Sequence, residues 1–181
     1  KYAKLKDETD QIVAVAPIKL DDVVLVSQNG YALRFNIEEV PVVGAKAAGV
    51  KAMNLKEDDV LQSAFICNTS SFYLLTQRGS LKRVSIEEIP ASSRAKRGLQ
   101  VLRELKNKPH RVFLAGAVVE KGFVGDLFST EVDENDQTLI VQSNKGTIYE
   151  SRLQDLNLSE RTSNGSFISD TISDEEVFDA Y

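Results

Sequence analysis

The stretch VLVSQNGYALRFNIEEVPVVGAKAAGV (residues 24–50) aligns without gaps to YLLTQRGSLKRVSIEEIPASSRAKRGL (73–99) and to IVQSNKGTIYESRLQDLNLSERTSNGS (140–166). In each copy, one glycine is followed 19 residues later by a second, and the first two copies share the pattern IEEVP or IEEIP. Agreement at this many positions identifies an internal repeat. The six repeated glycines, which we expect at turns, are Gly30, Gly49, Gly79, Gly98, Gly146 and Gly165.

Each copy is predicted to begin as a β-hairpin. In the first copy the apolar alternation is interrupted at Asn29-Gly30, a pair typical of a type I′ turn, and glycine stands at the same place in the other two copies. A loop of small and basic residues follows, then an alternating strand such as VKAMNL (50–55), an acidic turn, and an apolar strand such as VLQSAFI (60–66). Each unit is therefore expected to contain about four strands.

Repeated four-stranded units predict an all-β fold of propeller-type blades. The opening residues resemble the second half of a unit, so we expect a single domain of about three and a half to four blades that starts in the middle of a unit. A short basic helix over 95–106 is an alternative, but the alignment with the first unit favours a loop followed by a strand. The predicted units are 1–20 (partial), 21–70, 71–136 (basic, with an insertion at 119–138) and 137–181 (acidic).

The composition narrows the classes of function. The 181 residues are 42% hydrophobic, as in an ordinary globular protein. One cysteine excludes a disulfide framework and a cysteine-rich zinc site, and one histidine argues against a histidine-based metal centre. No apolar run reaches the ~20 residues of a membrane-spanning helix. We therefore expect a cytoplasmic protein without membrane attachment, and the missing initial methionine indicates a piece of a longer chain.

The net charge of −5 hides an uneven distribution of charge. Residues 73–122 contain 11 basic and 4 acidic residues, whereas residues 123–181 contain 3 basic and 13 acidic residues. Because electrostatic attraction decays over ~8–10 Å, the local charge decides what the surface attracts. If equivalent positions of stacked blades align, the basic residues form a strip that contacts phosphates without reading bases. The candidate DNA-binding residues are Arg34, Lys46, Lys51, Lys82, Arg83, Arg94, Lys96, Arg97, Arg103, Lys106, Lys108 and Arg111.

No residue pattern indicates catalysis or a metal site. Cys67 ends an apolar strand and is expected to be buried, and His110 in a basic turn is expected to be exposed or to contact phosphate. The neighbouring glutamates of IEEVP and IEEIP are expected on a strand, where their side chains diverge and cannot form an acid/base couple. The acidic run 131–137 lacks the glycine and the closing glutamate of a calcium-binding loop. A propeller whose acidic last unit binds a basic protein is the alternative function.

The hairpin glycine, the IEEVP/IEEIP segment and the small basic loop resemble the C-terminal DNA-binding domain of the A-type subunits of bacterial type IIA topoisomerases, gyrase A and ParC of topoisomerase IV. The resemblance covers the whole chain and implies a β-pinwheel, in which blades exchange strands. It also implies that a basic outer rim binds and bends double-stranded DNA and presents it to a catalytic core. That core would belong to a longer ATP- and Mg²⁺-dependent enzyme, an A2B2 heterotetramer that includes a ParE-like ATPase.

Gyrase A carries a glycine-rich basic loop of the type QRRGG[KR]G. The corresponding loops here, GAKAAG (44–49), SRAKRG (93–98) and ERTSNG (160–165), are incomplete. The departure favours ParC, whose parent enzyme relaxes and decatenates DNA, and leaves the DNA-wrapping domain of gyrase A as the alternative. No tyrosine lies in the sequence context of the family's nucleophile, so no catalytic residue and no cofactor are expected in this chain.

Overall fold

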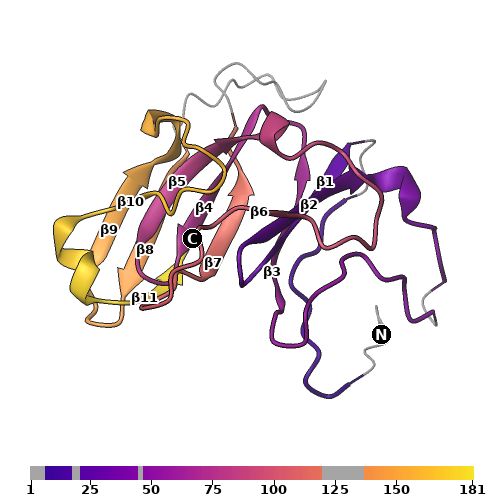
Figure 1. The fold of residues 1–181 in the computed structure, drawn as a ribbon, viewed down its shortest axis with the longest axis horizontal. Helices are drawn as coiled ribbons and strands as arrows, with labels where there is room; N and C mark the ends of the chain where they lie inside the picture. Colours follow the sequence, from indigo (N-terminus) through magenta and orange to yellow (C-terminus); the bar gives the residue numbers. More distant parts are fainter. Residues whose placement is uncertain (1–6, 18–20, 45–46, 120–136) are drawn as a thin grey trace.

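The computed structural model describes residues 7–17, 21–44, 47–119 and 137–181. Three antiparallel sheets stand side by side (Figure 1), with strand orders β3-β1-β2-β6, β10-β5-β4-β7 and β11-β8-β9. The predicted all-β, propeller-like fold is confirmed. The strands are β1 (Asp22–Ser27), β2 (Tyr31–Asn36), β3 (Leu61–Cys67), β4 (Ser71–Thr76), β5 (Ser80–Ser85), β6 (Leu99–Gln100), β7 (Val112–Ala117), β8 (Thr138–Ser143), β9 (Ile148–Arg152), β10 (Ser166–Phe167) and β11 (Val177–Ala180).

Neighbouring units exchange their outer strands. Strand β6 follows the loop of the second unit in sequence, but it pairs with β2 of the first sheet, with Ala32 opposite Leu99. Strand β10 of the third unit pairs in the same way with β5 of the second sheet. The exchange expected of a pinwheel is therefore present at both junctions. The predicted unit boundaries at 20, 70 and 136 stay a prediction, since each four-stranded sheet combines residues of two units.

A glycine with a left-handed backbone leads into each exchanged strand. Gly98 has a φ of +86°, and a Cβ atom there would lie 2.3 Å from the carbonyl oxygen of Ala32. Gly165 has a φ of +74°, and its Cβ would lie 2.6 Å from the carbonyl oxygen of Leu81. Only glycine accepts this conformation easily and lets the loop backbone approach the neighbouring strand so closely. The second repeated glycine thus marks the point of exchange.

The hairpin turns differ from the prediction. The N–H of Gly30 donates to the carbonyl of Ser27 (3.0 Å), and Gly79 and Gly146 close equivalent turns. Only the glycine has a positive φ at each turn, +82° at Gly30, whereas a type I′ turn needs positive φ at both central residues. The predicted type I′ geometry is therefore wrong. A left-handed glycine at the end of the turn lets the preceding residue vary between Asn29, Arg78 and Lys145.

The strand predicted at 50–55 is also absent. Its counterparts β6 and β10 form only because each has the outer strand of a preceding sheet to pair with. Residues 50–55 have no earlier sheet in the described part of the chain, although Met53 is buried against Leu25, Leu33 and Phe35. Residues 7–17 of the predicted partial unit form no strand. Most of the predicted insertion at 119–138 lies outside the described residues.

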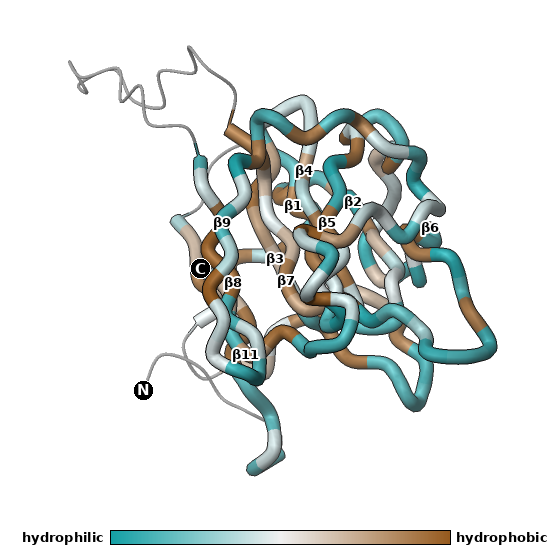
Figure 2. The backbone as a smooth tube through the Cα atoms, turned by 90° about the vertical axis from the view of Figure 1, so that its left-hand side faces the viewer, coloured by the Kyte–Doolittle hydropathy of each residue, from teal (hydrophilic) through white to brown (hydrophobic). Residues whose placement is uncertain are grey.

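Apolar residues between the sheets form the core (Figure 2). One cluster joins the first two sheets through residues such as Val24, Ala32 and Phe72. A second joins the second and third sheets through residues such as Leu75 and Val141. The middle sheet is therefore covered on both faces, which explains why every residue of β4 is buried. No helix in the described ranges is long and apolar enough to cross a bilayer.

The glutamate pairs lie in 3-10 turns rather than on strands, which corrects the prediction. The first turn, η1 (Ile37–Glu39), begins at Asn36, whose side chain accepts the N–H of Glu38. The second, η2 (Ile86–Glu88), is capped by Ser85 in the same way. The other 3-10 turns are η3 (Leu153–Asp155) and η4 (Asp170–Asp174). The first three of these turns reverse the chain after the second strand of each hairpin and start the loop that follows.

We predict that Gly98→Ala destabilises the protein much more than Gly49→Ala. Both glycines have left-handed backbones, which cost an alanine about 1–2 kcal/mol, but a Cβ at Gly49 meets no atom within 4 Å. The clash with Ala32 should add about 1–3 kcal/mol to the loss at Gly98. Urea midpoints of the two variants measure this difference, and equal midpoints would show that the strand exchange does not depend on close backbone contact.

Candidate nucleic-acid interface

The predicted basic residues gather at two places instead of forming one strip. The first place surrounds the loop that carries β6 onto the first sheet, and we call its cations the exchange-loop group: Arg34, Lys51, Arg94, Lys96 and Arg97. The second place is the end of the second sheet where the hairpin turn lies. We call the cations there and in the adjoining segment 103–111 the turn group: Arg78, Arg103, Lys106, Lys108 and Arg111. Of these, Arg103 lies against Asn164 of the loop that leads into β10, to whose Oδ1 its N–H donates at 2.8 Å. Arg78, the residue before the hairpin glycine, is not among the predicted DNA-binding residues, and the structure adds it to this group.

Two arginines of the exchange-loop group are held in place by neighbouring groups. The Nε of Arg34 lies 2.6 Å from Oδ2 of Asp22 in a half-buried ion pair, and its Nη1 reaches the carbonyl of Ile86 in η2 of the next unit. The guanidinium of Arg97 lies 3.9 Å from the centroid of the Tyr31 ring, a cation–π contact across the strand exchange. Both residues remain partly accessible, so they are ordered cations at the surface.

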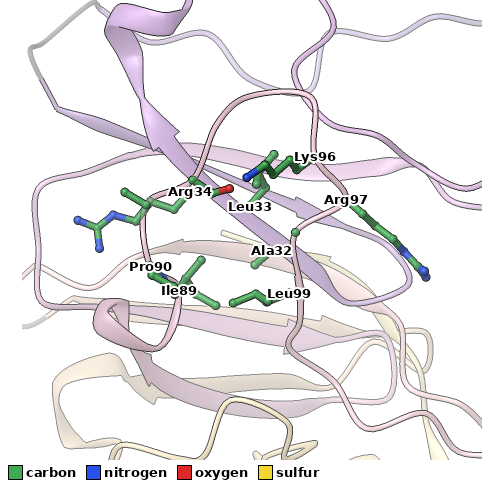
Figure 3. A pocket seen from close by; sticks show the side chains of 11 residues that line it. Ala32, Leu33, Arg34, Ile89, Pro90, Lys96, Arg97 and Leu99 are labelled. Carbon is green, nitrogen blue, oxygen red and sulfur yellow. The ribbon is translucent and has the colours of Figure 1, made fainter.

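The two lysines of this group are exposed. Lys96 presents its side chain at the loop, and the Nζ of Lys51 lies 2.6 Å from Oδ1 of Asn54. Beside the loop is a groove of about 350 Å³ (Figure 3). Apolar residues such as Ala32, Leu33 and Leu99 form its lining, while Arg34, Lys96 and Arg97 stand around it. Arg34 of β2 and the loop residues Lys96 and Arg97 thus place positive charge around an apolar surface.

Arg94 joins the loop to the preceding unit. Its N–H donates to Oε2 of Glu39 (2.8 Å), its Nε donates to the carbonyl of Glu39, and its Nη1 donates to the carbonyl of Lys51. Arg94 is half-buried. The residue predicted to bind DNA therefore also ties two units together.

The turn group faces acidic residues of the third unit. Arg78 and Lys108 line a cavity of about 500 Å³ together with Asp174, Glu175 and Glu176. Arg111 forms an ion pair with Glu104, in which Nη2 lies 3.7 Å from Oε1. Arg103, Lys106 and Lys108 are exposed. The opposite charges across this cavity offset part of the positive charge of Arg78 and Lys108.

Three predicted residues lie outside both groups. Lys46 lies outside the described residues. The Nε of Arg83 donates to Oγ of Ser71 (2.8 Å), and its Nη1 reaches the carbonyl of Gln154 in the third unit. Lys82 is only 2% exposed, and its Nζ donates to the carbonyls of Val101, Arg161 and Ser163 at 2.5–2.8 Å. We call the loop that leads into β10 (160–165) the second exchange loop, and the loop that leads into β6 (93–98) the first. Because its three donors are engaged, Lys82 stabilises the second exchange loop and is left out of our proposed interface.

Burial changes the protonation of Lys82. The pKa of its ammonium is lowered from the ordinary 10.5 to about 8, chiefly by desolvation, with the charge of Glu88 raising it and that of Arg161 lowering it. The equivalent residues of the other hairpins are Leu33 and Tyr149. The ammonium is therefore a particular feature of the second junction, and no repeat-wide pattern could have identified its role.

The two candidates for unusual chemistry are structural. Cys67 is buried, as predicted. The prediction of an exposed or phosphate-binding His110 is wrong, because the ring is buried between Oγ1 of Thr76 and Nη1 of Arg78, 3.1 Å from each. Burial and the charge of Arg78 lower the pKa of His110. Among the described residues no cluster of three or more His, Cys, Asp and Glu side chains could hold a metal ion.

Comparisons with known proteins agree with this architecture. The sequence matches the family "DNA gyrase C-terminal domain, beta-propeller" over residues 21–68 and 71–117. It is 95% identical to the A-type subunit of DNA topoisomerase 4 from Streptococcus pneumoniae serotype 4 over 181 residues, which is the whole of this chain and 22% of that protein. The chain spans about a fifth of the length of the curated relatives it matches.

Two solved structures resemble the fold of this chain. The crystal structure of the C-terminal domain of DNA topoisomerase IV matches with a TM-score of 0.84 and 36% identity, over 99% of this chain and 52% of that one. The gyrase A C-terminal domain matches with a TM-score of 0.70 and 18% identity, over 91% of this chain and 51% of that one, which shows the shared fold. The resemblance to the A-type subunit of topoisomerase IV, expected from the incomplete glycine-rich loops, is confirmed by the 95% sequence identity.

We predict that Lys82→Met lowers the free energy of unfolding by about 1–3 kcal/mol at pH 7, because three carbonyls lose their donor. Between pH 8 and 10.5 the unfolded state binds more protons than the folded state, since the pKa of folded Lys82 is about 8. The stability of the wild type should therefore rise relative to the variant across this range. Urea titrations at several pH values measure the difference, with exposed Lys106→Met as control, and parallel pH curves would contradict the assignment.

Proposed function

This chain belongs to the family of DNA gyrase C-terminal β-propeller domains, and we propose that it binds double-stranded DNA through the exchange-loop group without reading the base sequence. The observation that carries the proposal is the concentration of five cations around one exchanged strand. These cations come from two units, yet they meet because β6 lies on the first sheet. Lysine and arginine side chains at such a surface attract phosphates of any sequence.

The distribution of acidic residues supports this choice of surface. Arg78 and Lys108 of the turn group line one cavity with the acidic segment 174–176, of which Glu175 is also paired with Lys145. Around the exchange-loop group, Asp22 is paired with Arg34 and Glu39 accepts the N–H of Arg94. In the third unit Glu150 occupies the place of Arg34 and Arg83, and it is exposed. A DNA path along the outer strands would therefore meet attraction at the first junction and repulsion at the third sheet, which limits how far the DNA is bent.

The relatives support a wider proposal. We propose that this domain presents bent DNA to the catalytic core of a topoisomerase IV that relaxes and decatenates DNA, with ATP and Mg²⁺ acting in other parts of the enzyme. Its partners would be the other domains of the A-type subunit, together with a B-type ATPase, in an A2B2 assembly in the bacterial cytoplasm. Bending DNA costs of order 1–6 kcal/mol, so several phosphate contacts must act together. The gyrase-type wrapping function stays the alternative for the same fold.

We predict that the double variant Lys51→Gln/Lys96→Gln binds DNA about tenfold more weakly than the wild type at moderate salt. Both lysines are exposed, so their loss removes two phosphate contacts and should reduce the slope of log K against log salt by about two. Fluorescence anisotropy with duplexes of unrelated sequence measures both quantities.

The matched control is Lys106→Gln/Lys108→Gln, which makes the same charge change at exposed positions of the turn group. It should reduce affinity less, because acidic residues of the third unit already weaken the field there. A larger loss in the control would place the interface at the turn group. Absence of binding at low salt, or binding that does not respond to salt, would refute the proposed function. The alternative of a protein-binding propeller predicts instead that reversing the charge of 174–176 abolishes partner binding and leaves the basic loops dispensable.

A further inference from the structure

One glutamate in each of the first two units contacts the loop of the next unit. Oε2 of Glu39, the last residue of η1, accepts the backbone N–H of Arg94 at 2.8 Å. Oε2 of Glu88, the last residue of η2, accepts the backbone N–H of Arg161 at the same distance. Both glutamates follow the hairpin glycine of their own unit by nine residues, and both arginines follow theirs by fifteen. The same contact therefore occurs independently at two junctions.

The side chains of the same arginines complete the connection. Nη1 of Arg94 donates to the carbonyl of Lys51, and Nη1 of Arg161 donates to the carbonyl of Gln100 at 2.6 Å. Lys51 and Gln100 hold the same repeat position, two residues beyond the second glycine of the preceding unit. Each loop is thus fixed at its backbone by a carboxylate and at its side chain by a backbone carbonyl.

A carboxylate is well suited to this task but unfavourable for attracting DNA. Hydrogen bonds to a charged acceptor are about twice as strong as those between neutral groups, and the exposed carboxylate of Glu39 accepts the N–H of Arg94 at 2.8 Å. The same negative charge beside the exchange-loop group opposes the approach of phosphates. If Glu39 acted only through its charge, its removal would strengthen DNA binding. If it orders the loop, its removal would weaken binding.

We propose that Glu39 is a positioning residue that holds the first exchange loop in the orientation that presents its cations to DNA, and that Glu88 orders the second exchange loop by the same contact. This inference rests on the proposed function. Glu39 sets the position of Lys96 and Arg97, which follow Arg94 in the first exchange loop. Glu88 acts on the second loop together with Lys82, whose ammonium binds the carbonyls of Arg161 and Ser163. In the third unit, exposed Asp155 holds the equivalent position.

The neighbouring glutamate of each pair provides a matched control. Glu38 lies beside Glu39 in η1, is exposed, and removes the same charge when it is replaced. We expect Glu39→Ala to bind a DNA duplex about three- to tenfold more weakly than the wild type, and Glu38→Ala to bind equally well or up to about twofold more tightly. Glu39→Gln retains an acceptor oxygen and should fall between the wild type and Glu39→Ala. The readout is anisotropy at fixed salt, after circular dichroism and urea midpoints have shown that the variants fold.

A second measurement needs no DNA. Hydrogen exchange of the free protein should show reduced protection of the Arg94 amide in Glu39→Ala and unchanged protection in Glu38→Ala. Unchanged protection in Glu39→Ala would overturn the inference, and so would DNA binding by this variant that equals that of Glu38→Ala. If the wild type fails to bind DNA, the proposed function fails, and with it the role in DNA presentation. The exchange result then still decides whether Glu39 orders the loop.

Discussion

The exchange of the short outer strand is the constraint on which the rest of the structure depends. Strand β6 contains two residues, yet it brings the loop of the second unit onto the edge of the first sheet. A left-handed glycine makes this possible, because the loop backbone passes so close to the carbonyl of Ala32 that no side chain fits. Since the strand and its loop are continuous, this contact brings the loop to the first sheet, where Glu39, Lys51 and Tyr31 contact its arginines.

The proposed DNA binding and the stability of the fold therefore depend on the same residues at the junctions between units. Arg94, Arg97 and Arg34 carry charge that phosphates would attract, and each also makes a contact that joins two parts of the fold. For the DNA binding that we propose, this arrangement is favourable, because ordered cations lose little conformational entropy when they bind. The two exposed lysines, Lys51 and Lys96, are the members of the group that contribute charge with the fewest structural duties.

The two junctions solve the same packing problem with different chemistry. At the first, Leu33 packs into an apolar cluster with Phe35 and Met53. At the second, Lys82 occupies the equivalent position and binds three carbonyls of loops from its own and the following unit. A buried ammonium is tolerated at this position only because all of its donors are engaged in hydrogen bonds. The two junctions thus share the same backbone arrangement but differ in the side-chain contacts that stabilise it.

The sequence by itself determined the repeat, the all-β architecture, the positions of the exchange glycines and the basic second unit. These follow from local patterns, because strand alternation and left-handed turns depend on nearby residues. Only the tertiary structure decided that Lys82 and His110 are buried, that residues 50–55 form no strand, and that the cations form two groups. Each of these depends on which strand edge or carbonyl a neighbouring unit supplies, and contacts between residues far apart in the chain leave no periodic signal in one sequence.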